Sequence, residues 1–449
     1  MFLASVASAQ TRTSVGDGPW NNPATWDTGV PMTGENAVIA AGHTVTLNAN
    51  TAAAIASITI NPGGTLITTN PFTIDATTIT VNGTYSNGSS GAVNVSNWIV
   101  GPAATYNHTY DGGSIPFATT TRTWDATSNV FVTGIINATT LGGFGQTFGN
   151  VTWNSPLQDS NLYLEATATI QGDFDVLNTG TPDPTNHALR MSNTGTGYTI
   201  TVLGDFYVNA NATFKMNNST GSCALIISNN LTIDGVFMIV TGAASSTVTV
   251  TGNVVIGTGT LNMTEDGSAA VGTLNIAGDF SNSAGTLTET GGGNGSIVFN
   301  GGTTQTFTSG GTFSNDINYT VNGGTTLQMV AANTAIGGDG NFTLSAGATL
   351  GITSVDGITA TGSGAVGNIQ VTGSRNYNTN ANYIYNGNSD QDVGDGLPGT
   401  VNNLTINNSG GGGNNTVSLD SDIIISGTLN VAQGEFDLNG NNVTSVGSV

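Results

Sequence analysis

Two clusters of aspartates are the residues whose spacing best suits metal chemistry. One consists of Asp390, Asp392 and Asp395, and the other of Asp420 and Asp422. Carboxylate oxygens at alternating positions are hard ligands of the kind that Ca²⁺ takes in proteins. Neither cluster has the spacing of an EF-hand loop, and solvated acids at strand corners are the simpler interpretation. A Ca²⁺ site is therefore a hypothesis for these five residues, and we expect no other cofactor.

Aromatic side chains concentrate in one part of the chain, where they could form a sugar-binding surface. They are Trp98, Tyr106, Tyr110, Trp124 and Trp153. Exposed aromatic rings can stack on sugar rings, whereas unexposed rings pack against neighbouring segments. The sequence favours packing and keeps carbohydrate binding as the alternative for these five residues.

The basic residues argue against the polysaccharide hydrolases and lyases that often occupy parallel β-helices. Such enzymes combine clustered carboxylates for acid and base catalysis with basic groups close to the substrate. In this chain the basic residues are scattered: Arg12, Arg122, Arg190, Lys215 and Arg375. We therefore predict no catalytic residues and no enzymatic activity, with a polysaccharide hydrolase or lyase as the alternative.

Histidine and cysteine do not form a metal-binding motif. His43, His108 and His187 are far apart in the sequence, and the chain has neither a His-x-x-x-His nor a Cys-x-x-Cys spacing. The single cysteine, Cys223, lies in an apolar stretch and has no partner for an internal disulfide. We expect it to be a buried structural thiol.

The net charge of −22 comes from 27 acidic residues against five basic ones. A phosphate backbone would be repelled, so the composition excludes nucleic acid binding. Because few side chains are charged, much of the surface must be Thr, Ser, Asn and Gly. Such a surface suits self-association, other surface proteins or glycans as partners. No apolar stretch approaches the length of a membrane-spanning helix, so no membrane span is expected.

A recurring phrase of glycine, an acid or amide, and phenylalanine begins many short alternating strands. Copies include Gly172-Asp173-Phe174, Gly204-Asp205-Phe206, Gly278-Asp279-Phe280 and Gly340-Asn341-Phe342. Strands joined by glycine corners at repeated intervals are typical of a chain wound into coils. We predict an all-β fold, a right-handed parallel β-helix (β-solenoid) with an N-terminal cap. Tandem β-sandwiches are the alternative, because Asn-Gly steps also suit hairpins.

A second phrase is centred on glutamine and occurs three times, at Gln146, Gln305 and Gln391. Each copy is followed by a pair of strands with a glycine corner. This pattern indicates three larger repeats that begin near residues 145, 298 and 384.

The predicted organisation divides the chain into five segments. The start resembles the end of a signal peptide, because Ala7-Ser8-Ala9 has the small-x-small cleavage pattern. The segments are 1–9, a signal peptide remnant; 10–50, the N-terminal cap; 51–103, solenoid coils; 104–165, an irregular aromatic-rich insert; and 166–449, further coils. We expect the coils to continue beyond residue 449 in a longer protein.

The cap segment carries a family resemblance. Trp20, Trp26, the Gly29-Val30-Pro31 step and the stretch Gly42-His43-Thr44-Val45 follow one another in order. This order resembles the entry segment of the eight-glycine extracellular domain family. It resembles more closely the N-termini of repeat-rich, adhesin-like β-helix proteins on the surface of bacteria that use the type IX secretion route. The glutamine and glycine phrases are similar to the repeat regions of those proteins.

The resemblance and the composition lead to one functional hypothesis. They imply a secreted, extracellular or cell-surface structural protein that acts as an adhesin, stalk or filament component. The alternative is a carbohydrate-binding or polysaccharide-processing β-helix protein.

Overall fold

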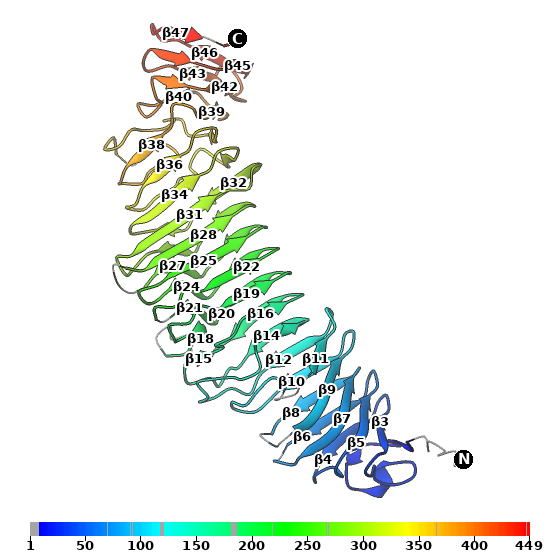
Figure 1. Ribbon diagram of the computed structural model, residues 1–449. Coiled ribbons are helices and arrows are strands. Elements are labelled where there is room, and N and C mark those ends of the chain that lie inside the picture. Colours follow the sequence, from blue (N-terminus) through cyan, green and yellow to red (C-terminus); the bar gives the residue numbers. More distant parts are fainter. Residues whose placement is uncertain are drawn as a thin grey trace, which may run out of the picture. The chain divides into compact units, whose positions relative to one another are not determined.

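The structure is a computed structural model that describes residues 9–449 except 70, 90, 92, 117–120, 181–185, 218, 266, 268, 365 and 446. The described residues form strands that pair in parallel from coil to coil, together with the short 3-10 helix η1 (Pro23–Thr25) (Figure 1). The predicted β-solenoid is confirmed. The alternative of tandem β-sandwiches is wrong, because sandwiches are built from antiparallel strands. Of the predicted signal peptide remnant, residues 1–8 lie outside the described residues.

The chain divides into two compact units, and unit 1 comprises Met1–Met191 and Thr199–Thr213. Its longest series of stacked strands is β2 (Gly18–Pro19), β4 (Thr44–Leu47), β6 (Thr65–Thr68), β8 (Thr84–Asn87), β10 (Thr105–His108), β12 (Asn129–Val132), β14 (Asn150–Asn154), β17 (Phe174–Asn178) and β20 (Phe206–Asn211). A second series is β1 (Thr11–Thr13), β3 (Asn36–Ile39), β5 (Ile55–Ile60), β7 (Ile74–Val81), β9 (Val93–Val100) and β11 (Thr121–Trp124). Later coils add β13 (Thr147–Phe148), β16 (Ala168–Ile170) and β19 (Thr199–Val202), and also β15 (Leu162–Tyr163) and β18 (Leu189–Ser192).

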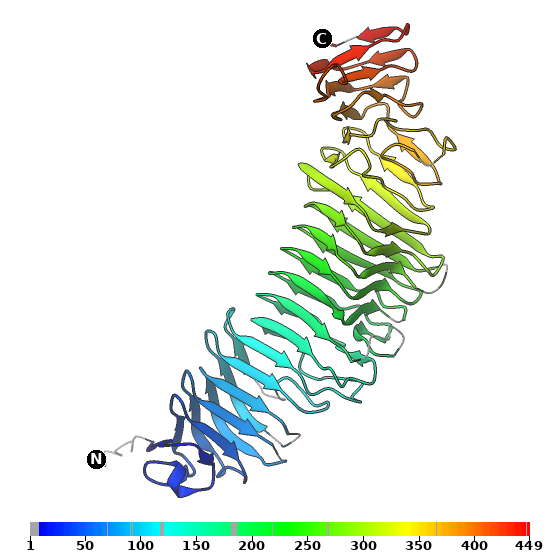
Figure 2. The same cartoon turned by 180° about the vertical axis from the view of Figure 1, so that it is seen from behind.

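Unit 2 comprises Ser192–Tyr198 and Phe214–Val449, and it is also a parallel stack, seen from behind in Figure 2. One series is β23 (Leu231–Ile233), β26 (Val254–Ile256), β29 (Phe280–Asn282), β32 (Thr304–Ser309), β35 (Thr326–Met329), β37 (Thr349–Ile352), β39 (Asn382–Tyr385), β42 (Asn403–Asn407) and β45 (Leu429–Gln433). A second is β22 (Ala224–Ile227), β25 (Ser245–Val250), β28 (Val271–Ile276), β31 (Asn294–Phe299), β34 (Ile317–Val321), β36 (Phe342–Leu344) and β38 (Arg375–Tyr377). A third is β21 (Thr213–Asn217), β24 (Val236–Val240), β27 (Thr260–Thr264), β30 (Thr286–Thr288) and β33 (Thr312–Phe313). The last coils carry β40 (Gln391–Asp392), β43 (Thr416–Ser418) and β46 (Glu435–Asp437), and β41 (Thr400–Val401), β44 (Ile423–Ile425) and β47 (Val443–Ser445).

The core consists of columns of inward-facing side chains in register. On β5 and β7, Ile58 lies opposite Ile79 and Ile60 opposite Val81, and all four are fully buried. Thr59, between the two isoleucines of β5, faces outward. Burying a side chain of this size stabilises a fold by about 1.5–3 kcal/mol, so alternation of apolar and polar residues is sufficient to orient each strand.

The glycine and aspartate of the recurring phrase bond adjacent coils to each other. Asp173 donates its backbone N–H to Asn150 Oδ1 at 3.0 Å, and its own Oδ1 accepts the backbone N–H of Asp205 at 2.8 Å. In unit 2, Asn253 Oδ1 accepts the N–H of Asp279 in the same way, at 2.8 Å. A Cβ at Gly204 would lie only 2.2 Å from Asp173 Oδ1. Glycine therefore clears the space in which this side chain reaches the next coil.

The pairing of the described strands runs through two of the predicted segments. Residues 104–165 do not interrupt the stack, because Thr105 on β10 is in register with Asn129 on β12, and Asn129 with Asn150 on β14. Several aromatic residues of this segment, Tyr106, Trp124 and Trp153 among them, are buried in the core. In the 10–50 segment, β1 pairs with β3 and β2 with β4, and β3 and β4 pair in turn with β5 and β6.

Candidate functional site

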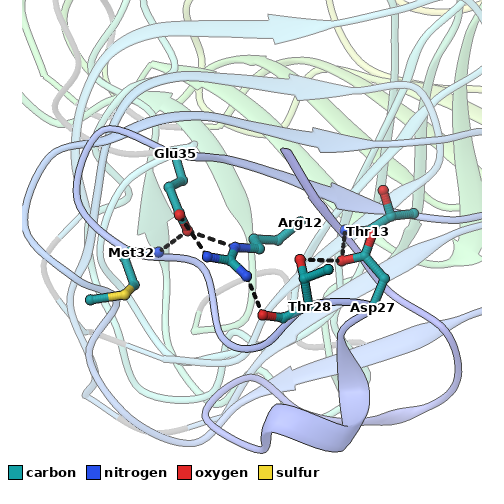
Figure 3. Close-up of polar contacts among 6 residues, drawn as sticks. All are labelled: Arg12, Thr13, Asp27, Thr28, Met32 and Glu35. Carbon is teal, nitrogen blue, oxygen red and sulfur yellow. Dashed lines mark hydrogen bonds and ion pairs between the residues drawn. The ribbon is translucent and has the colours of Figure 1, made fainter. Parts of the chain in front are cut away.

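Arg12 and Glu35 form a two-point ion pair at the N-terminal end of unit 1 (Figure 3). Arg12 Nε donates to Glu35 Oε2 at 2.9 Å, and Nη2 donates to Oε1 at 2.7 Å. Glu35 also accepts the backbone N–H of Met32 at 2.9 Å. The hydrogen bond from Arg12, and then that from Met32, lower the pKa of Glu35. The pair joins β1 to the loop that precedes β3.

Asp27 lies at the beginning of the same loop and bonds it to β1 (Figure 3). Its Oδ1 accepts the N–H of Thr13 at 3.1 Å and the hydroxyl of Thr28 at 3.0 Å, while Arg12 donates to the carbonyl of Thr28. The hydrogen bond from Thr13 is the main cause that lowers the pKa of Asp27. These bonds tie β1 to the loop between η1 and β3, so the cluster has a structural role in the cap.

The two tryptophans of the resemblance complete this cap. Trp26 donates its indole N–H to the carbonyl of Trp20 at 2.8 Å, and the rings meet edge to face with centroids 5.0 Å apart. Both are buried. The predicted cap therefore has a defined apolar centre and a polar rim.

Four of the five aromatic residues considered for sugar binding lie in the core, in the packing that the sequence favours. Trp98, Tyr106 and Trp153 are fully buried, and Trp124 is 5% exposed. Trp98 and Trp124 pack edge to face on Tyr106, with centroids 5.9 Å away in both cases. These residues occupy inward positions of their strands, so no ring face is available to a ligand. Tyr110 is half-buried.

A buried polar network surrounds Tyr106. His108 Nε2 lies 2.7 Å from the carbonyl of Gly112, and its Nδ1 lies 3.3 Å from the Tyr106 hydroxyl. Asn87 donates to the same hydroxyl at 3.2 Å. Burial lowers the pKa of His108 to about 4, against contributions from the Gly112 carbonyl and other groups that raise it. The imidazole is therefore neutral at pH 7, with Nε2 as the donor.

Two of the five aspartates of the calcium hypothesis bond to the backbone of the next coil. Asp390 accepts the N–H of Thr416 at 3.0 Å, and Asp422 accepts that of Asn442 at 2.7 Å. Both therefore act as the inter-coil acceptors already described for Asp173.

The other three aspartates lie closer together. Asp395 accepts the hydroxyl of Ser363 and the N–H of Ala360, the latter at 2.8 Å, and these two bonds lower its pKa. Burial, and then the charge of Asp392, raise the pKa of Asp420. Across the described ranges, no group of three or more His, Cys, Asp or Glu side chains is arranged to hold a metal ion. The predicted residues are not brought together as one site there.

The glutamine phrase has a structural role that sequence reasoning did not identify. Gln305 and Gln391 are buried side chains that bond to backbone groups on two sides. Gln391 Nε2 donates to the carbonyls of Ile352 and Ser354, at 3.2 and 2.9 Å, and its Oε1 accepts the N–H of Gly387 at 2.8 Å. We call this arrangement a glutamine clip. The signal was the recurrence of glutamine at an otherwise apolar inward position.

Gln146 is a variant of the clip in unit 1. Its Nε2 donates to the carbonyls of Ile115, at 2.7 Å, and Gly143, and its Oε1 accepts the indole N–H of Trp124 at 2.6 Å. Gln146 thus fixes β11 to the glycine-rich segment 142–145. Both of these elements border a cavity.

This cavity has a volume of about 560 Å³ and lies wholly within unit 1. Its polar lining includes Ser114, Arg122, Tyr163 and Glu165, and backbone of residues 142–145 forms part of the wall. Glu165 has a φ of 47°, in the left-handed region that residues other than glycine seldom adopt. Sequence reasoning missed this group because its members lie on different coils.

Comparison with known proteins identifies one domain. A model of the G8 domain matches residues 25–97, a stretch that includes β3 to β8 and most of β9. The match confirms the N-terminal resemblance to the eight-glycine extracellular domain family. None of the curated proteins and none of the solved structures compared with the chain matches it. In the part of the chain that the structure describes, no helix has the length and apolar character to cross a membrane.

Proposed function

We propose that the chain is a secreted structural protein of the cell surface or extracellular matrix, acting as an adhesin, stalk or filament component. One observation carries the proposal, which is the bonding of each coil to the next by side chains such as Asp173. In this arrangement a coil is stabilised by its neighbours, so a domain can be lengthened by adding coils. Such a domain is suited to presenting or spacing other groups.

The G8 match supports an extracellular location for this scaffold. Export by the type IX route belongs to the same proposal and is supported by the resemblance of the repeat phrases. The outward faces carry few charges, and residues such as Thr59, Thr80 and Thr105 are exposed in part. These outward faces would bind sugars, other surface proteins or second copies of the chain through hydrogen bonds.

A non-enzymatic role is part of the proposal. It is supported by the work that the candidate groups already do, since the tryptophans pack in the core and the aspartates bond to backbone N–H groups. Groups committed to structure in this way are poorly placed to act as acids or bases.

The test is to locate the protein on cells of the source organism. Antibodies raised against the purified chain should stain intact cells as strongly as permeabilised cells, and deletion of the gene should reduce attachment to solid surfaces. An antibody against a cytoplasmic protein serves as the control for cell integrity. Staining that requires permeabilisation would overturn the proposal.

A further inference from the structure

The second series of unit 2 repeats small, uncharged side chains on its outward face. Its strands β22, β25, β28, β31, β34 and β36 lie side by side (Figure 1). On each of them, outward positions alternate with buried ones. Successive pairings place the outward residues in two columns, which we call the threonine face: Ala224, Thr247, Thr273, Ser296 and Asn318 in one, and Ile226, Thr249, Asn275, Val298, Thr320 and Thr343 in the other.

The polar groups of the threonine face are held in place before anything binds. The hydroxyl oxygens of Thr273 and Ser296 lie 3.5 Å apart on neighbouring strands. Asn341, just before β36, donates its side-chain N–H to Asn318 Oδ1 at 2.7 Å. Threonine is branched at Cβ, so its χ1 angle has few choices and its hydroxyl and methyl groups take repeated positions. Preorganised groups of this kind lose little entropy on binding.

The threonine face is uncharged in a strongly acidic chain. Its strands, all within the described residues, contain no Asp, Glu, Lys, Arg or His, although the chain has a net charge of −22. Acids such as Asp316 and Asp339 lie in the corners that precede β34 and β36. A charged group is costly to remove from its hydration water. An uncharged face can therefore approach a solid surface without this cost.

The spacing of the two columns is close to that of oxygen atoms in ice. Each oxygen in ice is joined to four others by O–H···O bonds of about 2.7–2.8 Å, so second neighbours in this tetrahedral network lie about 4.5 Å apart. Neighbouring strands of a sheet lie about 4.8 Å apart. The difference is about 0.3 Å per coil, so an offset of only about 1 Å accumulates over four strands. Hydroxyl groups at this spacing can take the positions of lattice oxygens over several coils.

The first series of unit 2 is narrower at the corresponding coils. Its strands β23, β26 and β29 have three residues each, of which only the middle one faces outward. A single column repeats in one direction, whereas the two columns of the threonine face form an array in two directions. The second series therefore fits a crystal surface better than the first.

We propose that the threonine face binds ice, with the hydroxyls of Thr247, Thr249 and Thr273 hydrogen-bonded to lattice water and the methyl groups lying against the crystal surface. Ice fits this face because its surface is uncharged and has a repeat close to that of the coils. This activity goes beyond the structural role proposed above and does not rest on it. Cell staining tests location, whereas ice binding is measured on the purified chain, so either idea can fail alone.

The experiment is slow growth of ice from a dilute solution of the full chain, followed by measurement of the protein in the ice and in the remaining liquid. Growing ice excludes a protein that does not bind to it, and serum albumin serves as that reference. The chain should be enriched in the ice relative to serum albumin, and a seeded ice crystal in its solution should freeze below its melting temperature. Exclusion of the chain to the same extent as serum albumin would overturn the proposal.

Variants assign the binding to this face. Thr273→Tyr, at the centre of the face, should lower the enrichment at least about tenfold, because a ring that stands above the array separates several coils from the crystal. Thr308→Tyr, outward on β32 of the first series, is the matched control and should keep the wild-type enrichment. Wild-type enrichment in folded Thr273→Tyr, or in Thr249→Tyr if the first does not fold, would overturn the proposal.

A second copy of the chain is the other occupant to be tested for this face. Sedimentation of the full chain and of Thr273→Tyr distinguishes the two. A dimer that Thr273→Tyr converts to a monomer, together with exclusion of the wild-type chain from ice, would assign the face to a second copy and overturn ice binding.

Discussion

Gln391 accepts the backbone N–H of Gly387, four residues earlier, at 2.8 Å, and Gln305 accepts that of Gly301 in the same way at 3.0 Å. Each of these amides also donates to a carbonyl of an earlier coil, Ile352 for Gln391 and Ile276 for Gln305. These two glutamines are therefore buried clips that satisfy backbone groups where the chain turns. The sequence shows that the glutamine recurs, whereas the hydrogen bonds that its side chain makes depend on the fold.

Gln391→Leu should lower the free energy of unfolding of the chain by about 2–4 kcal/mol. The substitution leaves the Gly387 N–H and the Ile352 and Ser354 carbonyls without this partner in a buried place, and each unsatisfied group costs about 1–3 kcal/mol. Urea denaturation measures the change. Gln433→Leu, at an exposed position of β45, should change it by less than about 0.5 kcal/mol. Equal effects of the two substitutions would contradict the clip.

Asp173→Asn should leave stability unchanged or raise it slightly, whereas Asp173→Ala should lower it by about 1 kcal/mol. Asparagine keeps the oxygen that accepts the N–H of Asp205, and alanine does not. Asparagine also removes a negative charge that, after burial, helps to raise the pKa of Asp175. Thermal denaturation of both variants at neutral pH is the measurement. A loss of stability in Asp173→Asn as large as in Asp173→Ala would count against this role.

Acid should destabilise unit 1 through His108. Its pKa falls from 6.5 to about 4 on folding, so the unfolded chain binds the proton more readily. The stability that depends on neutral His108 is complete above about pH 6.5 and is lost as the pH falls toward 4, by up to about 3 kcal/mol. Denaturant titrations between pH 4 and 8 would measure this slope.

His108→Gln should flatten that slope, because glutamine does not titrate. His187→Gln is the control, because His187 lies outside the His108 network. Its Nε2 lies 3.0 Å from Asp159 Oδ1. A wild-type slope that persists in His108→Gln would show that another group is responsible.

Glu35 should cause a second loss of stability at a pH below that at which His108 acts. Its pKa is lowered from 4.5 on folding, mainly by Arg12, so its contribution is present above about pH 4.5 and is lost as the pH falls through the folded value. Glu35→Gln should reduce the fall of the melting temperature between pH 5 and 3. Asp17→Asn, also near the N-terminus, provides a comparison with a carboxylate that accepts one backbone N–H from Thr44. An unchanged fall in Glu35→Gln would exclude the ion pair as its source.

Strand alternation made part of the core predictable. The inward and outward positions of β5 and β7 follow from period-two patterning, which is local and needs only the sequence. The phrase Gly204-Asp205-Phe206 likewise predicted corners followed by strands. The same alternation places Trp98 and Trp153 inward, in agreement with the packing that the sequence favours.

The sequence by itself determined the fold class, the glycine-corner coils and the family of the N-terminal domain, because strand periodicity and corner residues are local properties. Tertiary structure decided which side chains meet, because partners lie one or more coils apart and the coils differ in length. It showed that Asp390 and Asp422 accept backbone N–H groups of the next coil. It also brought Arg122, Tyr163 and Glu165 to one cavity, a grouping set by the stacking of coils and not by any spacing along the chain.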